Sequence, residues 1–213
     1  MRPYSKGPTP YPPPTLEIPT PHGPARVHLR EVPAPRAALI LGHGAGGGVG
    51  APDLVAATRT ANELGVTVAL VEQPYRVAGR RSPAPAHQLD AAWLEVVEAL
   101  RRGRLSGLAL LVGGRSSGAR VACRTAAEAG AAAVVCLAFP VHPPGKGGDP
   151  SKSRLPELDA VKVPVLVIQG DRDPFGMPPK ARNRTVAVVP GDHSLRNSST
   201  VAGALRRWLP RRL

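Results

Sequence analysis

The 213-residue chain contains few aromatic residues, few cysteines and few acidic residues. Phe, Trp and Tyr together make up only 3% of it, so Leu, Val and Ala must fill any interior. This composition favours a compact sheet covered by Ala-rich helices over an aromatic-lined binding platform. The length and a hydrophobic fraction of 42% suffice for one domain with a substantial core.

Only two cysteines are present, Cys123 and Cys136, and they are too isolated for a disulfide framework or a metal-ligand spacing. We expect free buried thiols in a reducing compartment, with no metal ion and no cofactor. The N-terminus has no apolar signal region, and no apolar run is long enough to cross a bilayer. The sequence therefore predicts a cytoplasmic protein with no membrane partner.

The shortage of acidic residues leaves a formal net charge of +13. Such a charge is typical of nucleic-acid-binding proteins, but here the arginine pairs are scattered and are not interleaved with aromatic residues. We interpret the charge mainly as a coding bias and expect no specific nucleic-acid partner. A basic field could still favour anionic substrates or nonspecific contacts with polyanions.

Prolines divide the chain into two parts, since eleven of the 26 precede Arg36. Residues 1–24 are predicted to form an extended arm, because proline disrupts helices and central strands. Short edge strands are expected at 15–18 and 26–29. Residues 25–213 are predicted to form a single domain.

From Arg36 onward, apolar strands alternate with Ala-rich helical segments, a pattern typical of βαβ units. We therefore predict an α/β fold with a mostly parallel central sheet and helices on both faces. Strands are expected at 37–42, 66–71, 108–112, 132–137, 165–169 and 185–189, and helices at 53–64, 85–102, 117–129 and 195–209. A long irregular stretch, 137–158, follows the carboxyl end of a strand, where open α/β sheets bind ligands.

The strongest motif is Gly-Arg-Ser-Ser-Gly at 114–118, which matches G-x-S-x-G between an apolar strand and an Ala-rich helix. This is the context of a nucleophile elbow, in which small residues allow a sharp turn that exposes the serine hydroxyl. Ser116 is the predicted nucleophile. A structural glycine turn is the alternative interpretation.

A serine nucleophile needs a base and an acid that orients the base. Asp171 and Asp173 both follow the apolar run at 165–169, so position alone allows either to be the acid. The base follows the acid in enzymes with a nucleophile elbow, and His193 is the only histidine after Asp173.

A tetrahedral intermediate also needs hydrogen-bond donors for its oxyanion. The N–H of Ser117 should lie at a helix N-terminus, where the helix dipole assists. The Gly-rich segment after the strand at 37–42 offers the N–H of Gly44 or Ala45 as a second donor. A phosphate-binding loop is the alternative, but this segment lacks the Lys-Ser/Thr of a P-loop.

At these residues the chain resembles the α/β-hydrolase superfamily, over roughly Arg36 to Leu209. It is most similar to the small uncapped branch related to dienelactone hydrolases and to the alpha/beta-hydrolase-like domain of chromatin-complex subunits. The segments that carry the likeness are "LGHGAGGG", "VEQPYRVAGRRSPAP", "GGRSSGARVA", "FPVHPPGK", "VPVLVIQGDRDPFG" and "GDHSL". The resemblance implies that Asp173, at the end of a G-x-x-D turn, is the acid, and that His43 positions the oxyanion loop.

Together these features predict a lid-less serine hydrolase that cleaves an ester, thioester or related acyl bond of a small substrate. The open site should be bounded by residues 73–81 and 139–146, with substrate contacts from a set of five side chains: His43, Tyr75, Arg76, Phe139 and Met177. Tyr75, Arg76, Phe139 and Met177 could equally be packing residues. Two alternatives remain, a catalytically silent interaction module and a polyanion-binding protein, and the chain could be a monomer or a homodimer.

Overall fold

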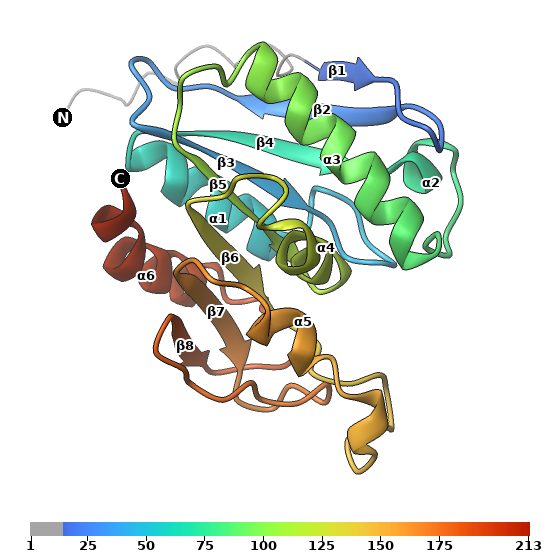
Figure 1. Ribbon diagram of the computed structural model, residues 1–213. Coiled ribbons are helices and arrows are strands. Elements are labelled where there is room, and N and C mark those ends of the chain that lie inside the picture. The colour runs from blue at the N-terminus through green and yellow to red at the C-terminus, as the bar shows by residue number, and fades with distance from the viewer. Residues whose placement is uncertain (1–14) are drawn as a thin grey trace, which may run out of the picture.

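Eight strands form one sheet in the computed structural model, which describes residues 15–213 (Figure 1). Their order is β1-β2-β4-β3-β5-β6-β7-β8. β1 (Thr15–Ile18) and β2 (Ala25–Arg30) pair antiparallel with their neighbours. The other six pair in parallel: β3 (Ala37–Gly42), β4 (Val66–Glu72), β5 (Leu110–Arg115), β6 (Ala133–Leu137), β7 (Val165–Gly170) and β8 (Arg184–Val189). The predicted mostly parallel α/β sheet is confirmed.

Helices cover both faces of this sheet, each over its own apolar core. α1 (Pro52–Glu63) and α6 (Ser198–Trp208) pack on one face, and Figure 1 shows them behind the strands. α3 (Ala86–Arg102), α4 (Ser117–Thr125) and α5 (Leu155–Asp159) pack on the opposite face. The short α2 (Pro74–Val77) follows β4. Because β3 to β8 pair in parallel, their carboxyl ends all lie at the same edge of the sheet.

The apolar periodicity of the sequence explains most of these elements. All six residues of β3 are buried, as expected for a central parallel strand covered on both faces. The predicted apolar face of α3 is buried too, with Trp93 and Leu100 each 1% exposed. α1 begins with Pro52 and carries Asp53 in its first turn, which suits a helix N-terminus.

Three differences from the predicted organisation concern β1, β2 and α6. β1 lies inside the predicted arm, and it joins the sheet by pairing with β2, so the described part of the arm belongs to the domain; residues 1–14 lie outside the described residues. β2 is an interior strand and only β1 is at that edge. α6 begins at Ser198 because Leu195 has a φ of 44° and the Asn197 side chain caps the helix.

The stretch 137–158 was predicted to be irregular, but it holds a 3₁₀ turn, η1 (Pro150–Lys152), and the start of α5. α5 begins at Leu155 with Pro156 in its first turn, a position that proline tolerates. The Gly and Pro residues of this stretch predicted a loop throughout, and the short helix α5 was therefore not predicted.

The cysteines lie where the sequence placed them, Cys123 in α4 and Cys136 in β6, both buried and free. Their sulfurs are 3.6 Å apart. The pKa of the Cys123 thiol is raised by its hydrogen bond with Cys136 and by burial. Within residues 15–213, no helix has the length and apolar character needed to span a membrane.

Candidate active site

Ser116 occupies the turn between β5 and α4 in a strained backbone conformation, with φ of 52° and ψ of −108°. A positive φ is uncommon for a residue with a side chain. The strained conformation persists only where the surrounding structure enforces it. This is the sharp strand-to-helix turn of a nucleophile elbow. The motif therefore forms the predicted turn, and it presents a half-buried hydroxyl at the carboxyl edge of the sheet.

The two motif glycines are required by close backbone packing around this turn. A Cβ on Gly114 would lie 2.6 Å from the carbonyl oxygen of Gly42, and one on Gly118 would lie 2.4 Å from the same oxygen. Real Cβ atoms do not approach so closely. The spacing of glycines around Ser116 thus reflects contact between the elbow and the end of β3.

His193 and Asp173 meet Ser116 in a continuous hydrogen-bonded chain. Nε2 of His193 lies 2.9 Å from Oγ of Ser116, and Nδ1 lies 2.9 Å from Oδ2 of Asp173. Because a carboxylate only accepts hydrogen bonds, Nδ1 carries the proton and Nε2 is the free base facing the hydroxyl. The three predicted triad residues are therefore brought together in the geometry that general-base activation of a serine requires.

Asp173 is fixed by neighbours that the sequence analysis did not identify. Its side chain is fully buried, and its Oδ1 accepts a hydrogen bond from the Phe175 N–H at 2.9 Å. Oδ2 accepts another from Nε2 of Gln169 at 2.8 Å. The ring of Phe175 also packs on the His193 ring, with centroids 4.2 Å apart. Gln169 is a polar residue at the end of a buried apolar strand, and that contrast was the available sequence signal.

Asp171, the other carboxylate considered, has a structural role. Its Oδ1 accepts the N–H of Gly191 at 2.8 Å, which ties the end of β7 to the turn before His193. The Asp171 side chain is about half exposed. Within residues 15–213, it makes no hydrogen bond to the imidazole of His193. The G-x-x-D resemblance selected the residue that does.

The predicted oxyanion loop, residues 43–48 after β3, is held through hydrogen bonds to two of its carbonyl groups. Nδ1 of His43 donates to the Gly44 oxygen at 2.8 Å, and the Tyr75 hydroxyl donates to the Ala45 oxygen at 2.9 Å. Since the C=O and the following N–H of a peptide point in opposite directions, the Gly44 carbonyl bond turns the Ala45 N–H away from His43. Burial lowers the pKa of His43 and keeps its ring neutral.

Three of the five predicted substrate contacts, His43, Tyr75 and Phe139, are buried in the structure. His43 uses its second nitrogen to accept the Gln73 N–H at 3.1 Å, so both ring nitrogens are occupied within the protein. Tyr75 is 3% exposed, and Phe139 is 0% exposed. His43 and Tyr75 hold the loop after β3 through hydrogen bonds, and Phe139 belongs to the apolar core. Arg76 is half-buried and Met177 is 42% exposed, so both remain candidates for substrate contact.

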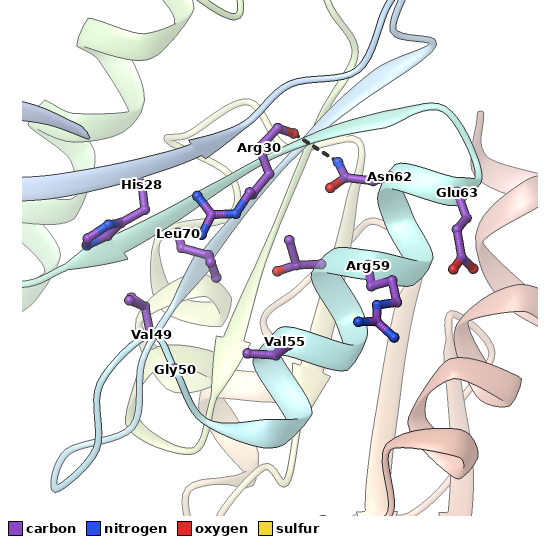
Figure 2. A pocket seen from close by; sticks show the side chains of 10 residues that line it. His28, Arg30, Val49, Gly50, Val55, Arg59, Asn62, Glu63 and Leu70 are labelled. Carbon is purple, nitrogen blue, oxygen red and sulfur yellow. Dashed lines mark hydrogen bonds between the residues drawn. The ribbon is translucent and has the colours of Figure 1, made fainter. Parts of the chain in front are cut away.

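A hollow of about 450 Å³ lies between β2 and α1, away from the triad (Figure 2). Leu70 forms its floor, and His28, Arg30 and Val55 lie around it. It contains none of the predicted site residues. Within residues 15–213, no cluster of three His, Cys, Asp or Glu side chains is arranged to hold a metal ion.

Comparison with known proteins agrees with this architecture. The Alpha/beta hydrolase domain family matches residues 35–204. A search of curated proteins found no match. Among solved structures, a serine hydrolase without a lid from Xanthomonas campestris is 23% identical, covering 95% of this chain and 97% of that one, with a TM-score of 0.70.

Two further solved structures share the fold. Est1E from Butyrivibrio proteoclasticus has a TM-score of 0.74 at 17% identity, covering 93% of this chain and 98% of that one. A dienelactone hydrolase from Anabaena variabilis has a TM-score of 0.72 at 17% identity, covering 95% and 100%. Because the family matches most of its length, the chain belongs to the alpha/beta hydrolase family.

Proposed function

We propose that this protein is a serine hydrolase that cleaves an ester, thioester or related acyl bond of a small substrate through an acyl-enzyme. The observation that carries the proposal is the hydrogen-bonded chain from Asp173 through His193 to Ser116. An isolated serine hydroxyl is a weak nucleophile, and an adjacent oriented imidazole is what activates it. The esterase and hydrolase neighbours support the same reaction class.

In the first half-reaction, Oγ of Ser116 attacks the substrate carbonyl carbon while Nε2 of His193 takes the hydroxyl proton. Asp173 stabilises the imidazolium that forms and keeps its tautomer fixed. The tetrahedral intermediate collapses when the alcohol or thiol departs, and the imidazolium returns its proton to that leaving group. The products at this stage are the free leaving group and an acyl ester on Ser116.

In the second half-reaction, His193 takes a proton from water as the water oxygen attacks the acyl carbonyl. Collapse of the second tetrahedral intermediate releases a carboxylic acid and restores the Ser116 hydroxyl. The negative oxygen of each intermediate would be held by the N–H groups of Ala45 and Ser117. Ser117 is the first residue of α4, and the first N–H groups of a helix have no acceptor within it.

The substrate reaches this site from the surface. The His193 side chain is 16% exposed and Ser116 is half-buried, so no domain covers the nucleophile within residues 15–213. Arg76 and Met177 are the proposed substrate contacts that remain accessible. A structure of Est1E holds ferulic acid, and esters of small carboxylic acids of that kind are the substrates to screen first.

A fluorophosphonate probe tests the proposal, because it reacts with activated serines without requiring the natural substrate. We expect the wild-type protein to be labelled and Ser116→Ala to remain unlabelled. Ser117→Ala is the matched control, since it keeps the backbone N–H and removes only the neighbouring hydroxyl. A folded wild type that resists the probe would instead favour a catalytically silent interaction module.

A further inference from the structure

Arg115, the residue before the nucleophile, contacts three separate segments of the site. It is the last residue of β5 and its side chain is 19% exposed. The elbow itself needs small residues at Gly114 and Gly118, and the turn places no such demand on position 115. A long, charged and mostly buried side chain at this point therefore calls for another explanation.

The first contact is with Asp53 at the start of α1. Nε of Arg115 lies 2.9 Å from Oδ2 of Asp53, whose side chain is fully buried. The Asp53 Oδ1 accepts the N–H of Leu54 at 2.9 Å, whereas Oδ2 has only this ionic contact. Burial raises the pKa of Asp53, and the guanidinium opposes that rise. A buried carboxylate without its partner would be strongly destabilising, so each charge requires the other.

The second and third contacts are with the histidine loop and the oxyanion loop. Nη2 of Arg115 donates to the main-chain oxygen of His193 at 3.2 Å. Nη1 lies against Gly44, where a Cβ would be only 2.8 Å from it. One planar guanidinium thus touches the backbone that carries the base and the backbone that carries the oxyanion donors.

We propose that Arg115 is a positioning residue that aligns the nucleophile elbow, the histidine loop and the oxyanion loop, with Asp53 as the buried counter-charge that holds its guanidinium in place. The inference rests on the proposed hydrolase function. It explains why α1 begins directly after the oxyanion loop with a buried carboxylate. It also explains why the position calls for arginine, since the donors of a guanidinium have fixed directions and those of lysine do not.

The alignment matters because small displacements of reacting groups have large effects on rate. A shift of about 1 Å can reduce turnover about 100-fold. Arg115 contacts no reacting atom, so its loss should lower the rate of the serine reaction without removing the nucleophile. Substrate affinity should change little, because Arg115 lies beneath the site.

The test uses the paired variant Asp53→Asn/Arg115→Gln, which removes both buried charges together and avoids leaving either one unpaired. Arg115→Lys is the conservative variant. The matched control is Arg120→Gln/Glu157→Gln, which removes a half-buried ion pair between α4 and α5, with Nη2 of Arg120 2.5 Å from Oε1 of Glu157. Each protein is compared for thermal midpoint, for the rate of fluorophosphonate labelling at Ser116, and for kcat and KM on a p-nitrophenyl ester.

We expect the paired variant and Arg115→Lys to fold and to be labelled about 10- to 100-fold more slowly, with kcat reduced and KM nearly unchanged. The control pair should be labelled at the wild-type rate. If the paired variant were labelled at the wild-type rate, the inference would be overturned while the proposed function would remain intact.

If the wild type itself is not labelled, the proposed function fails, and a second readout still decides on Arg115. The proton on Nδ1 of His193 gives a downfield NMR resonance when it is held by Asp173. We expect this resonance to weaken or shift in the paired variant but not in the control pair. An unchanged resonance would contradict the positioning role.

Discussion

The Nε2 atom of His193 lies 2.9 Å from the hydroxyl of Ser116, although 77 positions separate the two residues. The pairing arises because β5 and β8 end at the same edge of one parallel sheet, so the segments that follow them converge. Asp173 follows β7, the strand between β6 and β8, and completes the hydrogen-bonded chain from that edge. Several expected outcomes follow from these contacts.

Asp173→Asn should leave the shape of the site intact and nearly abolish turnover. The amide can donate to Nδ1 of His193, which would favour the tautomer whose Nε2 carries the proton and cannot act as a base. We expect kcat to fall by about 10⁴-fold. Steady-state kinetics on a p-nitrophenyl ester measure this. Asp171→Asn is the control, since the Asp171 side chain holds the turn at Gly191 and not the imidazole, and equal losses in the two variants would contradict the assignment.

Gln169→Leu should impair both stability and turnover. The buried amide of Gln169 donates to Asp173 Oδ2 at 2.8 Å and to the Gly176 oxygen at 2.8 Å. Leaving such buried acceptors without donors costs about 1–3 kcal/mol. We expect that loss in chemical denaturation and a lower kcat, because the carboxylate is less firmly oriented. A variant with wild-type stability and kcat would show that Gln169 does not orient the acid.

Tyr75→Phe tests the support of the oxyanion loop. The change removes one hydroxyl that donates to the Ala45 oxygen at 2.9 Å and leaves the buried ring in place. We expect a destabilisation of about 1 kcal/mol, together with a decrease in kcat at nearly constant KM. An increase in KM alone would indicate that Tyr75 contacts the substrate, which its burial argues against.

Gly118→Ala should be among the most destabilising single changes in the chain. The added Cβ would lie 2.4 Å from the Gly42 oxygen, a backbone atom that cannot move without displacing β3. We expect a loss of about 3 kcal/mol or more in the free energy of unfolding. Gly48→Ala is the control, since nothing lies within 4 Å of a Cβ there. Similar unfolding curves for the two variants would be inconsistent with the packing described.

The stability of the protein should depend on pH through His43. Burial lowers the pKa of His43 in the folded protein, so the unfolded chain takes up its proton more readily. The contribution of a neutral His43 is therefore fully present above about pH 6.5 and is lost as the pH falls below that value. We expect the free energy of unfolding of the wild type to decrease over this range more steeply than that of His43→Gln. Parallel pH profiles for the two proteins would contradict it.

The regular part of the fold could be predicted because burial on both faces makes each parallel strand a continuous apolar run. β3, β6 and β7 were identified within one residue of their ends for this reason. β5 was placed too early, at 108–112, since its last residues are the glycines and arginine of the elbow, which do not resemble a strand. The strands of the N-terminal hairpin were also predicted, but the prolines led to the first being assigned to the arm, whereas Ile18 and Val27 both join the core.

The three residues of the hydrogen-bonded chain could be predicted from sequence because the motif, the G-x-x-D turn and the last histidine each occupy a characteristic place. The surrounding residues could not. His43, Tyr75 and Phe139 were predicted to contact the substrate, yet all three are buried. The side chains of His43 and Tyr75 hold the loop after β3, and Phe139 packs in the core. Arg115 acts through contacts with segments distant in the chain, and no local pattern reports such contacts. Gln169 lies only four positions before Asp173, and the contrast of a polar residue at the end of an apolar strand was its only signal.

The proposed mechanism requires that Ser116 becomes acylated during turnover. Intact-protein mass spectrometry after acid quenching of a reaction with p-nitrophenyl acetate tests it directly. We expect a transient acetyl adduct on the wild type, which peptide fragmentation maps to Ser116. The adduct should form only very slowly in His193→Ala and should be absent in Ser116→Ala. Ester turnover by the wild type with no adduct at Ser116, or an equal adduct in Ser116→Ala, would contradict it.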